Sequence, residues 1–175
     1  MDTNLIFGNI VYIVIALFFL KGALYMVKQK HAVIIERLGK FNKVSKAGLH
    51  FKIPLIDSIA GNVNLRVREL PVEVETKTKD DVFVRIVVSV QFFVIDAPVG
   101  IKDSFYELNN PEQQIQSYVF DSIRSEVPMM ELDDVFAEKE KIALAVKTEL
   151  SDTMRQFGFD FIKALVTDID PDAKV

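Results

Sequence analysis

The chain has 175 residues, is 50% hydrophobic and carries a formal net charge of −4 at pH 7. It contains no cysteine, which excludes disulfides, thiol catalysis, thiolate metal sites and S-palmitoylation. The acidic total and the lack of a recognised binding motif argue against a nucleic-acid partner.

The first predicted element is a transmembrane helix from Leu5 to Val27, an apolar run with few interruptions. At ~1.5 Å per residue the run reaches roughly 34 Å, against a hydrocarbon core of about 30 Å. Lys21 lies near the end of the run, where its ammonium can reach the interface. The residues expected to form this membrane anchor are Leu5, Ile10, Val14, Leu17, Phe18, Leu20, Leu24 and Val27.

A secretory signal peptide and a buried core helix are the alternatives to an anchor. A signal peptide needs basic residues before the run and a small-residue cleavage site after it, and the sequence has neither. A core helix needs a larger surrounding domain than the rest of the chain provides. The start Met1-Asp2 lacks the glycine needed for myristoylation, so we expect the peptide anchor to hold the protein alone.

Charge predicts the orientation of the anchor. Asp2 is the only charged residue before the run, whereas six basic residues follow it within about 20 residues. We therefore expect a single pass, with the N-terminus outside and the bulk of the chain in the cytoplasm. A re-entrant hairpin with both ends in the cytoplasm is the alternative. Anionic lipids of the cytoplasmic leaflet would attract the nearby lysines by ~1 kcal/mol per charge, and the predicted membrane-surface residues are Lys28, Lys30, Lys40, Lys43, Lys46 and Lys52.

Two extended segments follow the anchor. Residues 32–38 are rich in β-branched side chains and predict a strand that ends at Gly39. Residues 44–57 predict a turn and then an extended segment, which Pro54 confines to an edge or an unpaired position. We expect the apolar side chains of this region to pack on the domain core, with contact to lipid headgroups as the alternative; they are Phe51, Ile53, Leu55, Ile56 and Ile59.

An antiparallel hairpin is predicted next. Residues 62–76 alternate apolar and polar side chains, but the phase changes around residues 68–71, which implies a bulge or a break. A polar turn at residues 79–81 then leads to residues 82–94, the clearest alternation in the chain.

Helices follow the hairpin. Asn110 and Pro111 supply an N-cap and an N1 proline, and Pro128 ends the helix that they begin. Residues 131–136 predict a short helical turn, and residues 142–157 a second amphipathic helix closed by Gly158. Alternation then returns in residues 159–169. The predicted fold class is α+β, with helices packed against an antiparallel sheet.

Residue chemistry predicts no catalytic, cofactor or metal site. His31 and His50 have no partners at ligand spacing, so His50 is expected to pack or to form a hydrogen bond. The pairs Asp80-Asp81 and Asp133-Asp134 suit turn and helix-start roles. No nucleophile motif or phosphate-binding glycine loop is present, and we expect that the protein is not an enzyme.

Five segments stand in a recognisable order, and they are residues 33–40, 47–57, 78–84, 157–159 and 167–171. In this order they resemble the stomatin/prohibitin/flotillin/HflK-HflC (SPFH, or band-7) family. Within the family, the sequences of these segments are most similar to those of the hypersensitive-induced-reaction and stomatin-like branch. The most specific part of the resemblance is the family element Gly48, Leu49, His50, Phe51, Ile53, Pro54 and Asp57.

The resemblance implies an SPFH-like domain behind the anchor and a function as a membrane scaffold. The expected divisions are an anchor at 1–30, a strand-rich first subdomain at 31–96, a second subdomain at 97–170 and the start of a truncated C-terminal helix at 171–175. The implied partners are the lipid bilayer, further copies of the chain or a paralogue as an oligomer, and a client such as a channel or a membrane protease. A membrane-tethered hydrolase and a monomeric lipid-binding module are the alternatives.

Overall fold

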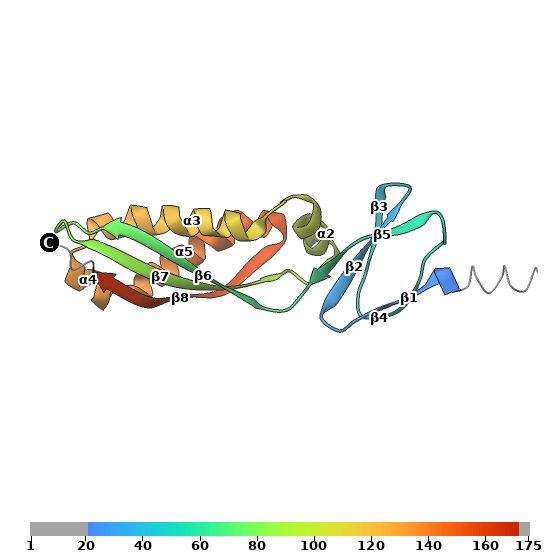
Figure 1. The fold of residues 1–175 in the computed structure, drawn as a ribbon, viewed down its shortest axis with the longest axis horizontal. Helices are drawn as coiled ribbons and strands as arrows, with labels where there is room; N and C mark the ends of the chain where they lie inside the picture. The colour runs from blue at the N-terminus through green and yellow to red at the C-terminus, as the bar shows by residue number, and fades with distance from the viewer. Residues whose placement is uncertain (1–20, 172–175) are drawn as a thin grey trace, which may run out of the picture. The chain divides into compact units, whose positions relative to one another are not determined.

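The computed structural model describes residues 21–171 and divides the chain into two compact units, of which the first ends at Asn64 and the second begins at Leu65 (Figure 1). Each unit is described by itself. The boundary expected after residue 96 falls inside the second unit, because the strands on its N-terminal side share a sheet with the last strand of the chain.

The first unit consists of two small antiparallel sheets. In one, β1 (Leu24–Val27) pairs with β4 (Gly48–Phe51). In the other, β2 (His31–Arg37) lies between β3 (Lys40–Ser45) and β5 (Asp57–Asn64). Ala32 to Ile35 are buried in succession, as expected of a central strand covered on both faces. The core of this unit therefore forms around β2, with Val27 of β1 packed against Val33 and Ile35.

Strand β1 corrects part of the predicted anchor. Residues 21–23 are helical, but Leu24 to Val27 are extended and pair with β4, so the helix does not continue to Val27. The apolar run alone does not distinguish a helix from a strand, and the pairing partner lies more than 20 residues further along the chain. Within residues 21–171 no helix has the length and hydrophobicity needed to cross a membrane.

The second unit is one antiparallel sheet with helices on a single face. Its strands β6 (Arg68–Lys77), β7 (Phe83–Val94) and β8 (Phe159–Pro171) lie in the order β6-β7-β8. Helices α3 (Pro111–Glu126) and α5 (Lys139–Met154) lie on one face of this sheet (Figure 1). The even-numbered residues of β7 are buried, and its odd-numbered residues lie on the opposite face of the strand. This arrangement confirms the predicted hairpin and the α+β class. It also places Pro171, expected to begin a helix, at the end of β8.

Local sequence signals account for most elements of the second unit. The bulge or break predicted around residues 68–71 was wrong, because β6 pairs with β7 through these residues without a shift of register. The interruption lies instead at residues 65–67, between β5 and β6. Asn110 caps α3 by accepting a hydrogen bond from the Gln113 backbone, and the helix passes into η1 (Val127–Met129) at Pro128. Helix α4 (Leu132–Ala137) matches the predicted helical turn. The helix α2 (Pro98–Tyr106) was not predicted.

Gly158 ends the last helical segment and also packs closely against another glycine, Gly100. After α5 and η2 (Arg155–Phe157), Gly158 adopts a φ of +81°, as the predicted helix stop requires. A Cβ atom added there would lie 2.0 Å from the carbonyl oxygen of Gly100 in α2. The turn before β8 and the start of α2 therefore touch backbone to backbone, and the Ile95 amide also donates to the Gly158 carbonyl over 2.9 Å.

Candidate functional site

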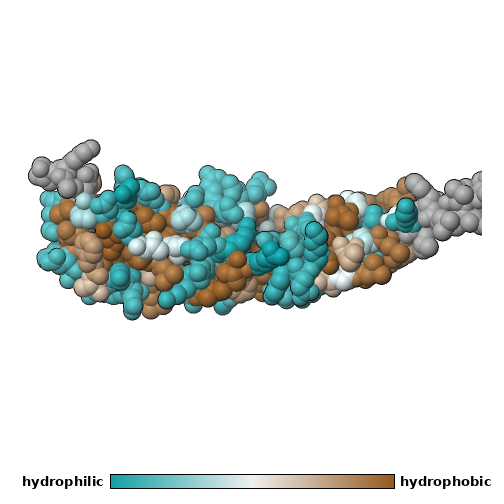
Figure 2. Space-filling model, turned by 60° about the horizontal axis from the view of Figure 1, so that its bottom comes forward, coloured by the Kyte–Doolittle hydropathy of each residue, from teal (hydrophilic) through white to brown (hydrophobic). Residues whose placement is uncertain are grey.

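An apolar surface covers one face of the ribbon formed by β1 and β4. Leu24 lies opposite Phe51 and Met26 lies opposite Leu49, and all four side chains are exposed. Because side chains alternate across a strand, these four residues share one face and Tyr25, Val27 and His50 share the other. We call the exposed set of Leu24, Met26, Leu49 and Phe51 the ribbon face. Figure 2 shows hydrophobic surface over the first unit, at the right of the view.

The opposite face of the ribbon is fixed to the rest of the first unit. Val27 is buried in the core, and the Tyr25 hydroxyl lies 2.6 Å from the Ser45 hydroxyl. The rings of Tyr25 and His50 stack with centroids 5.7 Å apart, and His50 Nε2 donates to the Lys46 carbonyl over 2.5 Å. This is the packing and hydrogen-bonding role expected of His50. The anchored inner face holds the ribbon face outward.

A loop after β4 extends the apolar surface. Leu55 at its tip is 90% exposed, and Phe51, Ile53, Ile56 and Ile59 are exposed as well. The expectation that these side chains pack in the core was therefore wrong. The loop forms a tight turn, because the Asp57 backbone amide donates to the Ile53 carbonyl over 2.9 Å. So short a turn cannot fold its side chains back into the core. We call residues 53–56 the apolar loop.

The apolar loop lies next to the start of the described chain. The Lys52 amide donates to the Ala23 carbonyl over 2.7 Å, and a Cβ atom added at Gly22 would lie 3.7 Å from the Pro54 side chain. The loop therefore adjoins Gly22 and Ala23, which belong to the C-terminal part of the predicted anchor. Leu55 has a φ of +70°, a strained conformation for a residue with a side chain.

Asp57 holds the apolar loop in this shape. Its side chain is buried and accepts hydrogen bonds from Arg37 Nε over 2.7 Å, from Arg37 NH2 over 3.2 Å and from the Ile53 amide over 2.9 Å. The hydrogen bonds from Arg37 and Ile53 lower the pKa of the Asp57 carboxyl to about 2, against the opposing effect of burial. The carboxylate thus joins β2 to both ends of the loop.

We expect the loop to loosen in acid. A carboxyl whose pKa is lower in the folded state stabilises that state above its unfolded pKa, and the stabilisation is lost as pH falls toward 2. Hydrogen exchange at the Ile53 amide should therefore accelerate relative to neighbouring amides between about pH 4 and pH 2. Asp57→Asn should show fast exchange already at neutral pH and lose this dependence. The exposed Asp168→Asn is the control, and equal protection in Asp57→Asn and the parent would contradict the role given to Asp57.

The predicted membrane-surface lysines are spread over the first unit. Lys28 and Lys30 lie in the turn between β1 and β2, and Lys40 and Lys43 lie on β3. All six side chains are at least partly exposed, including Lys46 and Lys52. Lys43 Nζ donates to the carbonyl of Phe51 over 3.1 Å, which brings one predicted cation to the ribbon.

Some of the remaining predicted site residues lie within residues 21–171, which the structure describes, and others lie outside them. Of the anchor set, Leu24 is on the ribbon face and Val27 is in the core, whereas Leu5, Ile10, Val14, Leu17, Phe18 and Leu20 lie outside the described residues. The family element spans β4, the apolar loop and Asp57, the first residue of β5. Sequence reasoning missed the ribbon face, although Leu49, Phe51 and Ile53 do alternate with polar residues.

The adjacent carboxylates have structural roles. Asp80 accepts a hydrogen bond from the Thr78 hydroxyl over 2.6 Å and another from the Leu132 amide over 3.1 Å, at the start of α4. The bond from Thr78 is the main cause that lowers the pKa of Asp80. Asp133 and Asp134 lie in the first turn of α4, where acidic residues favour the helix dipole. These positions agree with the predicted turn and helix-start roles.

Comparison with known proteins assigns the chain to a family. The family model described as "SPFH domain / Band 7 family" matches residues 25–175. The chain is 43% identical over 150 residues to hypersensitive-induced response protein 4 of Arabidopsis thaliana, covering 85% of this chain and 51% of that protein. It is 28% identical over 152 residues to a stomatin-like protein of Caenorhabditis elegans, covering 85% of this chain and 45% of that protein.

A stomatin homolog of Pyrococcus horikoshii is 28% identical over 169 residues, which cover 96% of this chain and 61% of that protein. The chain thus spans about half the length of the first two of these relatives. The family model covers the ribbon except Leu24, the apolar loop and the whole second unit. The chain therefore belongs to the SPFH, or band-7, family.

Proposed function

We propose that this chain is a non-enzymatic membrane scaffold, which oligomerises, organises a membrane microdomain and modulates a neighbouring membrane protein such as a channel or a membrane protease. Membership of the SPFH family supports a scaffold role in general. The observation that carries the membrane part of the proposal is the ribbon face with the apolar loop beside it. The predicted anchor, shortened at its C-terminal end by strand β1, holds the chain in the membrane, with the N-terminus outside and the bulk of the chain in the cytoplasm.

The position of the apolar loop supports membrane contact by the first unit. An anchor that ends near Lys21 leaves Gly22 and Ala23 at the level of the headgroups, and the loop adjoins these two residues. Leu55 at the tip then meets the boundary between headgroups and acyl chains. Fully burying an aliphatic or aromatic side chain is worth about 1.5–3 kcal/mol, so a few inserted residues add appreciably to attachment.

Lysines beside the ribbon support a preference for anionic lipid. We expect a chain that starts at Lys21 to bind vesicles containing phosphatidylserine more tightly than neutral vesicles. Changing Lys40, Lys43, Lys46 and Lys52 to Gln should weaken that binding by up to roughly a thousandfold at low salt, at about 1 kcal/mol per charge. The loss should shrink as salt rises, because screening already weakens the attraction in the parent.

The control for this experiment is thermal stability, which exposed lysines hardly affect. Vesicle co-sedimentation at several salt concentrations measures the binding. Equal binding of the variant and the parent at low salt would mean that these lysines are an ordinary solvated surface. Apolar contacts would then account for any remaining attachment.

The size of the particle separates the scaffold from a monomeric lipid-binding module. We expect the full chain, extracted in mild detergent, to have a mass several times its own 19.9 kDa after correction for bound detergent. Light scattering coupled to size exclusion gives this mass. A monomer that nevertheless binds anionic vesicles would favour the lipid-binding module.

A further inference from the structure

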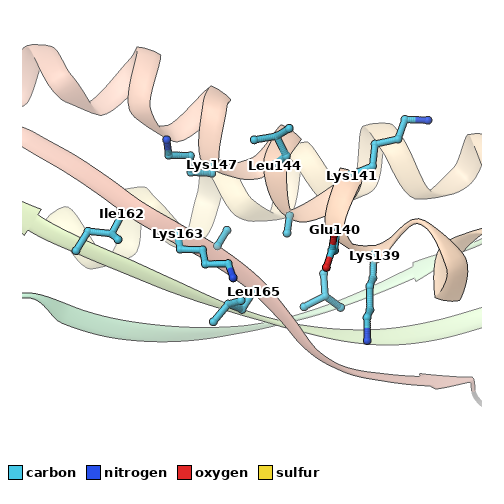
Figure 3. A pocket seen from close by; sticks show the side chains of 11 residues that line it. Lys139, Glu140, Lys141, Leu144, Lys147, Ile162, Lys163 and Leu165 are labelled. Atoms are coloured by element: carbon cyan, nitrogen blue, oxygen red, sulfur yellow. The ribbon is translucent and has the colours of Figure 1, made fainter.

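A groove runs along the second unit between helix α5 and strand β8. It has a volume of about 680 Å³. In Figure 3, Leu144 and Lys147 come from α5, while Ile162, Lys163 and Leu165 come from β8. Strand β8 is at the edge of its sheet, so its outer side has no strand partner among the described residues.

The groove presents apolar side chains to solvent. Leu144 is 63% exposed and Ile162 is 51% exposed. Ile162 is the extra residue of a β-bulge, because Gln91 pairs with Lys163 and Phe92 pairs with Phe161. Bulges at a sheet edge re-aim a side chain, and here the bulge belongs to the lining of the groove. Paired apolar residues of this size on an exposed helix and strand favour an interaction surface.

The lysines that line the groove restrict the kind of partner that can bind in it. Lys139, Lys147 and Lys163 line it, and none of them has a carboxylate within ion-pair distance among residues 21–171. Lys141 is paired with Glu138 over 2.7 Å, which leaves Glu140 as the acidic residue of the lining. An occupant that suits this groove carries apolar side chains flanked by carboxylates.

Exposed apolar and acidic residues lie near one another in the chain on η1 and α4. Met129 and Phe136 are exposed apolar residues, and Asp133 and Asp134 lie between them in the chain. Neither aspartate forms an ion pair within the described part of the chain. We call Met129, Asp133, Asp134 and Phe136 the acidic knob.

The acidic knob is held rigidly. Val127 and Val135 are fully buried beneath it. The turn between β6 and β7 also supports it, since the Lys79 amide donates to the Met130 carbonyl over 2.9 Å and Asp80 accepts from the Leu132 amide. A preordered surface loses little conformational entropy when it binds.

We propose that the acidic knob of one copy docks in the groove between α5 and β8 of a second copy. Phe136 and Met129 then cover Leu144 and Ile162, while Asp133 and Asp134 meet the lysines of the groove. This inference rests on the proposed self-association and names the face that carries it. Because the two surfaces differ, a single contact leaves one knob and one groove free, so association continues to a ring or closes as a reciprocal pair.

The absence of cysteine from the chain allows a direct test by cross-linking. Phe136→Cys in one tagged full chain and Leu144→Cys in another are mixed in mild detergent and treated with a short bismaleimide. The proposal expects a covalent heterodimer carrying both tags. The control pairs Leu144→Cys with Val99→Cys, an apolar position on α2 that is 67% exposed against 45% for Phe136, and should give little heterodimer although its cysteine is the more accessible. Equal yields from the two pairs would overturn the proposal.

A charge-reversal experiment is the second test of the proposed docking. Changing Lys139, Lys147 and Lys163 to Glu in the Leu144→Cys chain should abolish the cross-link, and changing Asp133 and Asp134 to Lys in its Phe136→Cys partner should restore it. None of the five side chains is buried, so the fold should tolerate the changes, at the cost of the favourable interaction of residues 133 and 134 with the α4 dipole. If the oligomer keeps its full mass but this cross-link does not form, the proposed docking is wrong and the proposed scaffold function still stands. A parent chain that is monomeric in detergent and in vesicles overturns both.

Discussion

Replacing Leu49 and Phe51 by Ser should lower the affinity of a chain that starts at Lys21 for lipid vesicles by roughly a hundredfold, about 3 kcal/mol. Both side chains lie on the ribbon face and are largely exposed, so their loss removes apolar contact with lipid and leaves the core of the first unit unchanged. The effect should persist at high salt, because it does not depend on charge. Vesicle co-sedimentation measures it.

The second unit offers a closely matched control pair. Phe83 and Val99 are 61% and 67% exposed, against 56% for Phe51 and 69% for Leu49. Phe83→Ser with Val99→Ser therefore removes one aromatic and one aliphatic side chain of equal exposure, and vesicle binding should stay within twofold of the parent, about 0.4 kcal/mol. If both double variants lose the same affinity, general hydrophobicity and not the ribbon face governs membrane contact.

Gly158→Ala should destabilise the second unit by about 2–5 kcal/mol. An alanine at a φ of +81° costs roughly 1–2 kcal/mol, and its Cβ would also overlap the Gly100 carbonyl, which adds about 1–3 kcal/mol of overpacking strain. The backbone cannot give way easily, because the Gly158 carbonyl accepts from the Ile95 amide at the end of β7. The midpoint of urea unfolding should fall accordingly, with the slope unchanged.

Gly39→Ala isolates the conformational part of this effect. Gly39 has a φ of +78° in the turn between β2 and β3, and a Cβ atom there would meet nothing within 4 Å. This variant should lose only about 1–2 kcal/mol. Equal losses at the two glycines would show that the close approach of Gly158 to Gly100 does not contribute.

Local signals in the sequence predicted the second unit well. The alternation of residues 82–94 has a period of two that only a strand explains, and Asn110 with Pro111 gives α3 an unambiguous start. Helix α2 lacks such signals, since Ala97 provides no capping side chain and the first turn contains no acidic residue. Its first residue, Pro98, was its only clear start signal, and a proline alone also suits a turn.

Contacts between distant segments explain what the sequence did not reveal. Strand β1 forms only because β4, more than 20 residues away, pairs with it, so the apolar run was extended into one helix. The resemblance to the family included Asp57, but its hydrogen bonds with Arg37 join two strands and leave no periodic pattern. The outward direction of Leu55 likewise depends on the turn that Asp57 closes.

The depth of single labels in a bilayer tests the central claim, contact of the first unit with the membrane, most directly. A fluorophore is attached at Leu49→Cys, Leu55→Cys or Val99→Cys of the full chain in vesicles, and lipids with quenchers on their acyl chains are compared with a water-soluble quencher. We predict that acyl-chain quenchers reach the labels at positions 49 and 55 but not the label at position 99. Quenching at positions 49 and 55 by the water-soluble reagent alone would contradict the account.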